Sequence, residues 1–154
     1  MLYTQAPANF EPRIVTVGCM VEYDGKLLFL RRHSSRRYPG KWGCPAGGQE
    51  PGETIAAAAL RELKEETGIS ALEPSLHYCG MRFVRYPADQ DFIYHLFWLV
   101  LCTEPHIILN PGEHDKFAWV AREEAGEVDY LGGKGDINAC LQMIPVHSAA
   151  LRNF

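Results

Sequence analysis

The sequence predicts a single α/β domain in which strands and helices alternate. Long runs rich in β-branched and aromatic residues, at 14–23, 77–86 and 91–102, have the length and composition of strands. Between them, residues 55–67 show helical periodicity and stop at a glycine. With 154 residues and 47% hydrophobic content, one core suffices, so we treat residues 1–154 as one domain.

The N-terminal third predicts a hairpin followed by a loop. Ile14–Tyr23 and Lys26–Arg31 are apolar runs separated by Asp24-Gly25, and an Asp-Gly pair between apolar runs is a strong hairpin signal. The next segment, 33–48, is rich in glycine, proline and serine. We expect it to form a loop that leads through a short strand into the first helix.

The first helix has recognisable signals at both ends. Pro51 and Gly52 predict a turn, Thr54 is an N-cap candidate, and the alanine run that follows favours a helix starting near Ile55. Gly68 predicts the end, because glycine adopts the left-handed conformation there and lets Ile69 close onto the helix.

The second half of the chain predicts further strands and short helices. We expect the turn 87–90 to join strands at His77–Tyr86 and Asp91–Cys102, and a short strand at Lys116–Val120. Helical candidates at Ala121–Ala125 and Gly135–Ile144 are limited by Gly126 and Pro145.

Three carboxylates lie on one stripe of the first helix. Glu62, Glu65 and Glu66 stand at i, i+3 and i+4, and two of them fall in the last turn, where the helix dipole disfavours negative charge. A solvated charged face is the alternative, but such a face places its acids in the first turn. Clustered oxygen ligands on a rigid element suit Mg²⁺ or Mn²⁺. The stripe therefore predicts a metal site.

The surrounding residues match a longer pattern, G-x5-E-x7-R-E-U-x-E-E-x-G-U, in which U is aliphatic. This pattern resembles the Nudix box. The matching residues are Gly47, Glu53, Arg61, Glu62, Leu63, Glu65, Glu66, Gly68 and Ile69.

The Nudix resemblance implies an α/β/α sandwich with a mixed central sheet. It also implies a Mg²⁺-dependent hydrolase, with Mn²⁺ as another suitable ion, that cleaves the diphosphate linkage of a nucleoside diphosphate derivative or a (deoxy)nucleoside triphosphate. On this resemblance, the metal ligands are Glu62, Glu65, Glu66 and the Gly47 carbonyl. Arg61 would orient a ligating carboxylate, and Glu53 would support the site or contact the metal through water.

The general base has several candidates. Glu65 is the first, and the acidic loop 110–115 offers Glu113 and Asp115, although a plain hydrophilic loop is the alternative there. His95 and His114 are also candidate acid or base groups. Isolated histidines in an apolar strand or a turn are more often structural.

Substrate contacts are expected from the loop before the box. Arg36, Arg37 and Lys41 would meet phosphates, and Trp42 would stack on a base, although a solvated connection is the alternative. Arg82 and Arg85 should point to opposite faces of their strand, so we expect one of them, Arg82, to contribute.

Composition limits the partners. A net charge of −4 argues against stable complexes with nucleic acid polymers and favours a small phosphorylated substrate, expected to be a nucleotide. Five scattered cysteines without a C-x-x-C pair indicate neither disulfides nor a zinc site, and there is no apolar run long enough to span a membrane. We expect a cytoplasmic protein, for which exposed edge strands make a homodimer reasonable.

Two other functions fit the same motif. A nucleotide-sensing module would keep the fold and the pocket with weak catalysis, but it would not need the full set of acids that this chain has. An RNA 5′-end pyrophosphohydrolase is the second alternative. Side-by-side assays on mononucleotides and short RNA distinguish it from the main prediction.

Overall fold

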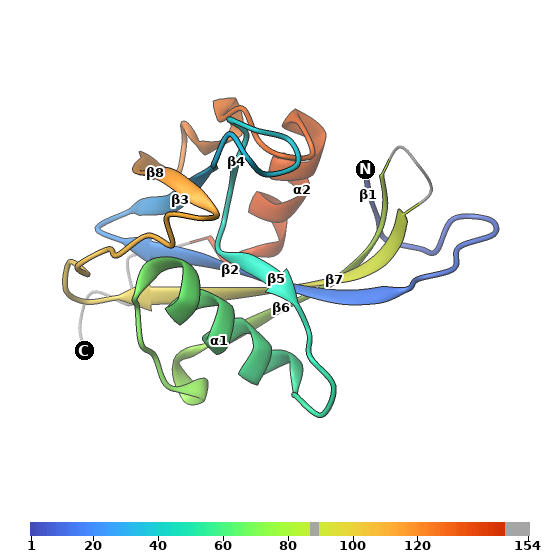
Figure 1. The fold of residues 1–154 in the computed structure, drawn as a ribbon, viewed down its shortest axis with the longest axis horizontal. Coiled ribbons are helices and arrows are strands. Elements are labelled where there is room, and N and C mark those ends of the chain that lie inside the picture. Colours follow the sequence, from blue (N-terminus) through green and yellow to red (C-terminus); the bar gives the residue numbers. More distant parts are fainter. Residues whose placement is uncertain (87–89, 147–154) are drawn as a thin grey trace.

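A central sheet separates two helices in the computed structural model, which describes residues 1–86 and 90–146. Helix α1 lies against one face and α2 lies on the other (Figure 1). In chain order, the elements are β1 (Leu2–Tyr3), β2 (Ile14–Tyr23), β3 (Lys26–Arg32), β4 (Trp42–Gly43), β5 (Ala46–Gly48), α1 (Ile55–Thr67), the 3-10 turn η1 (Glu73–Ser75), β6 (His77–Tyr86), β7 (Gln90–Leu101), β8 (His114–Ala121), the 3-10 turn η2 (Ala125–Glu127) and α2 (Lys134–Met143).

The sheet is mixed, as predicted. Its strand order is β1-β6-β7-β2-β3-β4, with β5 paired to β2 and β8 paired to β3. Strand β2 runs parallel to β7 over its whole length, while β6 pairs antiparallel with β7. Strand β2 also changes partner, because residues 16–18 pair with β5 and residues 22–23 pair with β3. This divergence brings β5 beside α1.

The strand β2 is buried on both faces, so its alternating side chains supply two cores. Val17, Cys19 and Val21 belong to the core that packs under α1, together with Leu63. Met20 belongs to the other core, which lies under α2. The predicted α/β/α sandwich is therefore confirmed.

Helix α1 begins and ends where the sequence predicts. The Thr54 hydroxyl accepts a hydrogen bond from the Ala57 N–H at 3.1 Å. Gly68 has φ 74°, and its N–H donates to the Lys64 carbonyl at 2.9 Å. These two caps set where the helix begins and ends, and therefore where its acidic residues lie relative to β5.

The prediction of a helix at Ala121–Ala125 was wrong. Ala121 is the last residue of β8 and pairs with Lys26, and the chain then turns into η2. The strand ladder overrides the helix propensity of this short run. The expected turn at 87–90 falls largely on residues 87–89, which lie outside the described part. Within that part, no helix has the length and apolar character needed to cross a membrane.

Candidate active site

The three acids of the α1 stripe have different environments. Glu66 is buried, with 4% of its surface exposed. The Glu62 side chain is 15% exposed, whereas that of Glu65 is 56% exposed. The three carboxylates therefore form a gradient of solvent exposure, from the exposed Glu65 through Glu62 to the buried Glu66.

Glu66 lies at the inner end of this gradient, next to β5. Its Oε2 accepts a hydrogen bond from the Ala46 N–H at 2.9 Å. Burial raises the pKa of Glu66 to about 8, and the nearby carboxylates of Glu62 and Glu113 also raise it. A cation at this position would lower that pKa and compensate for the buried charge.

Glu62 lies directly over the backbone of β5. A Cβ placed on Gly47 would stand 2.0 Å from the Glu62 carboxyl carbon, so only glycine lets the carboxylate approach. Burial raises the pKa of Glu62, and the adjacent Arg61 opposes this shift. The Gly47 backbone and the Glu62 carboxylate are thus neighbours, as a shared metal site requires.

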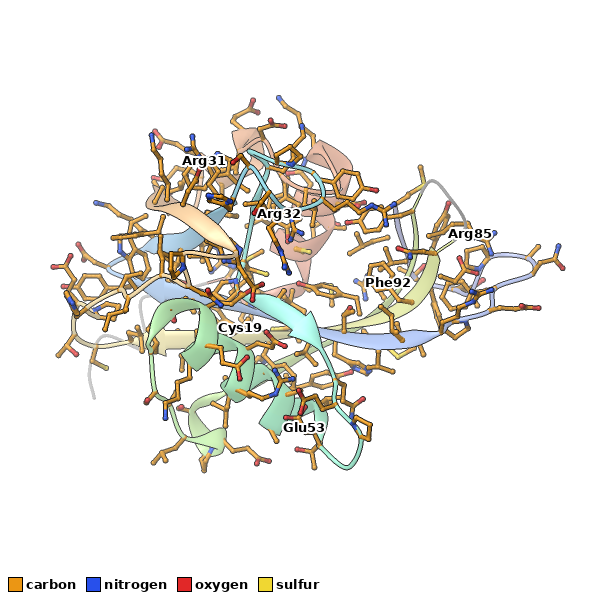
Figure 2. All side chains as sticks on the ribbon, in the orientation of Figure 1. Cys19, Arg31, Arg32, Glu53, Arg85 and Phe92 are labelled. Atoms are coloured by element: carbon orange, nitrogen blue, oxygen red, sulfur yellow. The ribbon has the colours of Figure 1, made fainter. Side chains whose placement is uncertain are left out.

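Arg61 organises the outer end of the box. Its guanidinium contacts Glu53 at 2.7 Å and Glu62 at 2.7 Å, and it donates to the Gly48 carbonyl at 2.8 Å. Glu65 is a more distant partner, at 3.4 Å. The hydrogen bond from Arg61 lowers the pKa of Glu53. Figure 2 labels Glu53 beside the start of α1.

A cavity of about 180 Å³ opens next to Glu66, on the face of the sheet opposite the α1 core. Figure 2 shows Arg32 and Phe92 on this side of the sheet. The lining residues combine a polar end near Glu66 with apolar and aromatic walls. They are Leu2, Thr16, Arg32, Gly43, Cys44, Ala46, Gly47, Glu66, Val84, Tyr86, Phe92, Tyr94, His114, Tyr130, Leu131 and Cys140.

Arg32 and His114 face the cavity beside Glu66. Arg32 donates from Nε to the Arg37 carbonyl at 2.7 Å, and burial lowers its pKa. His114 is 6% exposed, and its Nδ1 lies 3.9 Å from Glu66 Oε1 without a hydrogen-bond partner among the described residues. Burial lowers the pKa of His114 to about 4, so the ring is neutral at pH 7.

Sequence reasoning missed Arg32 as a site residue. It directly follows the predicted strand Lys26–Arg31 and belongs to no motif, and only the pairing of Arg32 with His114 across β3 and β8 brings it to the cavity. His114 was a candidate, but the loop pattern gave no sign that its ring would be buried against Glu66.

The predicted phosphate-binding side chains lie outside the cavity lining. Arg36 contacts Glu113 at 3.3 Å, Arg37 donates to Gln90 at 3.0 Å, and Lys41 contacts Asp129. Arg82 donates to the neighbouring Met81 carbonyl at 2.8 Å, while Trp42 packs against the core under α2. In this structure, these side chains have protein partners.

The remaining base candidates are also paired. Glu113 accepts from Asn110 at 3.1 Å, and Asp115 forms a bidentate pair with Arg31 at 2.7 and 2.9 Å. His95 bonds to the Tyr78 hydroxyl at 2.8 Å. Glu65 is the most exposed acid of the α1 stripe, and solvent reaches it readily.

The residues present fit a divalent cation held partly by water. Across residues 1–86 and 90–146, no three acidic, histidine or cysteine side chains converge on one point, and Arg61 neutralises Glu62. The carboxylate oxygens of Glu62 and Glu66 nevertheless lie beside the β5 backbone around Gly47. Glu66 is buried, and the one ion-pair partner that it has among the described residues, His114, is neutral. Mg²⁺ commonly completes such a shell with water and substrate phosphates.

Known proteins resemble this chain in sequence and in fold. The family model for the NUDIX domain matches residues 12–138. Phosphatase NudJ of Escherichia coli strain K12 is 39% identical, covering 75% of this chain and 72% of that protein. The nucleoside triphosphatase NudI of Enterobacter sp. strain 638 is 31% identical, covering 74% of this chain and 86% of that protein.

A solved structure has the same fold. A MutT protein from Methanosarcina mazei Go1 superposes with a TM-score of 0.71 and 25% identity, covering 86% of this chain and 94% of that one. The chain therefore belongs to the Nudix family. It is a hydrolase of the pyrophosphohydrolase class, and that class generally depends on divalent metal ions.

Proposed function

We propose that this protein is a Mg²⁺-dependent pyrophosphohydrolase that cleaves the diphosphate linkage of a nucleoside triphosphate or of a nucleoside diphosphate derivative. One observation carries the proposal: Glu66 belongs to the carboxylate stripe of α1, and its buried side chain also lines the polar end of the cavity. The name of NudI, a nucleoside triphosphatase, supports a nucleotide as the substrate.

The proposed metal ligands are Glu62, Glu65, Glu66 and the Gly47 carbonyl. When bound, Mg²⁺ would neutralise phosphate charge and lower the pKa of the attacking water. Arg61 holds Glu62 in place and is held in turn by Glu53, so both act as positioning residues. Their contacts match the role of groups that orient metal ligands.

The proposed general base is Glu65, with Glu113 as the second candidate. Among the described residues, the exposed Glu65 side chain has one ion-pair contact, the 3.4 Å contact of Oε2 with Arg61, which leaves its second oxygen available to water. Glu113 is engaged by Arg36 and Asn110 and would have to exchange partners first. Glu65 therefore needs the smaller rearrangement.

Arg32 is the cationic side chain best placed for a phosphate in the cavity. It lines the cavity beside Glu66 and keeps a donor-rich guanidinium there. Arg36, Arg37, Lys41 and Trp42 belong to the loop that follows β3 and stay proposed contacts for the outer part of the substrate. Arg82 is the remaining proposed contact.

The test is release of phosphate and pyrophosphate from a nucleotide panel with Mg²⁺ or Mn²⁺. We expect metal-dependent release by the wild type and strong losses in Glu66→Gln and Glu65→Gln. The exposed Glu104 provides a matched control, because Glu104→Gln makes the same chemical change at a residue that does not line the cavity. A wild-type rate no higher than the background left in Glu66→Gln and Glu65→Gln would indicate a nucleotide-sensing module instead.

Assays on short 5′-triphosphorylated RNA beside mononucleotides distinguish the proposed function from that of an RNA 5′-end pyrophosphohydrolase. The net charge of −4 predicts a preference for the mononucleotide. A higher kcat/KM on the RNA would contradict this assignment of the substrate.

A further inference from the structure

The first strand of the chain forms part of the cavity wall. Strand β1 is short and pairs at the edge of the sheet, where Leu2 lies opposite Val84 and Tyr3 lies opposite Phe83. Leu2 lines the cavity that contains Glu66, whereas Tyr3 lines a neighbouring groove of about 700 Å³. Strand β1 therefore separates the inner cavity from the outer groove.

A buried carboxylate on α2 holds this strand. Asp136 Oδ1 accepts a hydrogen bond from the Leu2 N–H at 3.0 Å, and Asp136 is only 3% exposed. It lies in the first turn of α2, where the helix dipole stabilises negative charge. A Cβ on Gly132 would stand 1.9 Å from Asp136 Oδ2, so the glycine keeps space for this carboxylate.

The two ends of the cavity differ in chemistry. Glu66, Arg32 and His114 form the polar end. The side chains of Leu2, Val84, Phe92 and Leu131 form an apolar wall. A substrate with phosphates at the polar end would place its organic group against this wall, next to Leu2.

We propose that Leu2 is a specificity-determining residue for the organic group of the substrate, and that Asp136 is the positioning residue that fixes it. The inference rests on the proposed function, since it assumes a phosphorylated organic substrate in this cavity. Strand β1 has two residues and, among the described residues, pairs with β6 alone. Hydrogen bonds between Met1 and Arg85 hold the start of the strand, and the hydrogen bond from the Leu2 N–H to Asp136 fixes Leu2 itself.

Binding of a nucleoside triphosphate analogue with methylene bridges in place of the anhydride oxygens tests this without catalysis. With Mg²⁺ present, we expect Leu2→Gly to raise the Kd of the analogue by about tenfold, in line with the loss of the apolar contact that the half-buried Leu2 offers the ligand. Inorganic tripolyphosphate has no organic group, so its Kd should change by less than about twofold. Equal weakening of both ligands, or of neither, would overturn the proposal.

The role of Asp136 is tested by a pair of variants. Asp136→Asn keeps a carbonyl oxygen as acceptor for the Leu2 N–H and loses only the charge that lies 3.4 Å from the exposed Met1 ammonium, so it should bind the analogue as the wild type does. Asp136→Ala removes the acceptor, so it should raise the Kd of the analogue selectively and speed hydrogen exchange at Leu2 and Tyr3. Slow exchange at these amides in Asp136→Ala would contradict the positioning role, even if that variant is destabilised.

Tyr3→Ala is the matched control on the same strand, because Tyr3 lines the outer groove. It should leave the Kd of the analogue within about twofold of the wild type, whereas a tenfold rise would show that loosening of β1, and not the Leu2 contact, causes the effect. A wild type that binds the analogue but hydrolyses no nucleotide would refute the proposed function and leave this binding test intact.

Discussion

The two ends of β5 lie near glutamates of opposite character, one contacted directly and the other linked to the strand through Arg61. At the outer end, the Gly48 carbonyl accepts from Arg61, which pairs with Glu53 and keeps the pKa of that carboxyl low. At the inner end, the Ala46 N–H donates to Glu66, whose pKa burial raises to about 8. Glu53 already has a cation in Arg61, whereas no lysine or arginine forms an ion pair with Glu66 among the described residues. A buried acid in this position is suited to bind a metal ion.

The largest predicted effect comes from the inner end. Glu66→Gln keeps a side-chain oxygen for the Ala46 N–H but removes a metal ligand. We expect kcat/KM to fall by roughly a thousandfold, because a bound metal provides several kcal/mol of transition-state stabilisation. Steady-state assays with Glu104→Gln as the control measure the change. A loss below tenfold would mean that Glu66 is not a ligand.

A smaller loss is expected at the outer end. Arg61→Lys keeps the charge but loses the planar fork that joins Glu53, Glu62 and Gly48. We expect kcat/KM to fall by about 10- to 100-fold, as for other groups that orient metal ligands.

Arg31→Lys is the control for this change, because Arg31 makes a similar bidentate pair with Asp115 away from the box. Exposed pairs of this kind are worth at most about 1 kcal/mol, so we expect near wild-type activity. Equal losses of kcat/KM in Arg61→Lys and Arg31→Lys would show that the Arg61 substitution acts through lower protein stability.

Two adjacent glycines of β5 differ in how closely they approach Glu62. Gly47→Ala would push a methyl group into the Glu62 carboxylate, whereas a Cβ on Gly48 meets nothing within 4 Å. We expect Gly47→Ala to weaken Mg²⁺ affinity by about tenfold, on the scale of a displaced ligand support. Gly48→Ala should be nearly neutral, and isothermal titration of both variants with Mg²⁺ checks this. Equal affinities would show that Glu62 is not held against Gly47 for metal binding.

The smallest effect is on stability against pH. The pKa of Glu66 is higher in the folded protein, about 8, than its ordinary value of 4.5, so the folded state holds the proton more tightly. Its contribution to stability is therefore fully present below pH 4.5 and is lost as pH rises through 8. In metal-free buffer, the Tm of the wild type should fall by several degrees relative to Glu66→Gln across this window. Parallel Tm curves would contradict the raised pKa.

Local sequence signals determined much of the fold. Thr54 and Gly68 predicted the ends of α1, and the Asp24-Gly25 turn predicted the β2–β3 hairpin, because caps and tight turns depend on a few neighbouring residues. The helix predicted at 121–125 was wrong because the structure of this run depends on pairing with a strand far away in the sequence, and not on neighbouring residues. The expected homodimer stays a prediction.

The site was predictable only in part. The spacing of the box predicted that Glu62, Glu65 and Glu66 share a stripe, but it contained nothing about how deeply each would be buried. The positions of Arg32, His114 and Leu2 depend on pairings between segments far apart in the chain. No local pattern encodes such pairings, so the cavity emerged only from the structure.

The most direct measurement is a Mn²⁺ titration followed by electron paramagnetic resonance, comparing the wild type with Glu66→Gln in the presence of the methylene-bridged analogue. If the buried carboxylate binds the cation, the wild type shows a saturable Mn²⁺ site whose affinity drops at least tenfold in the variant. Identical titration curves for the two proteins would contradict the account.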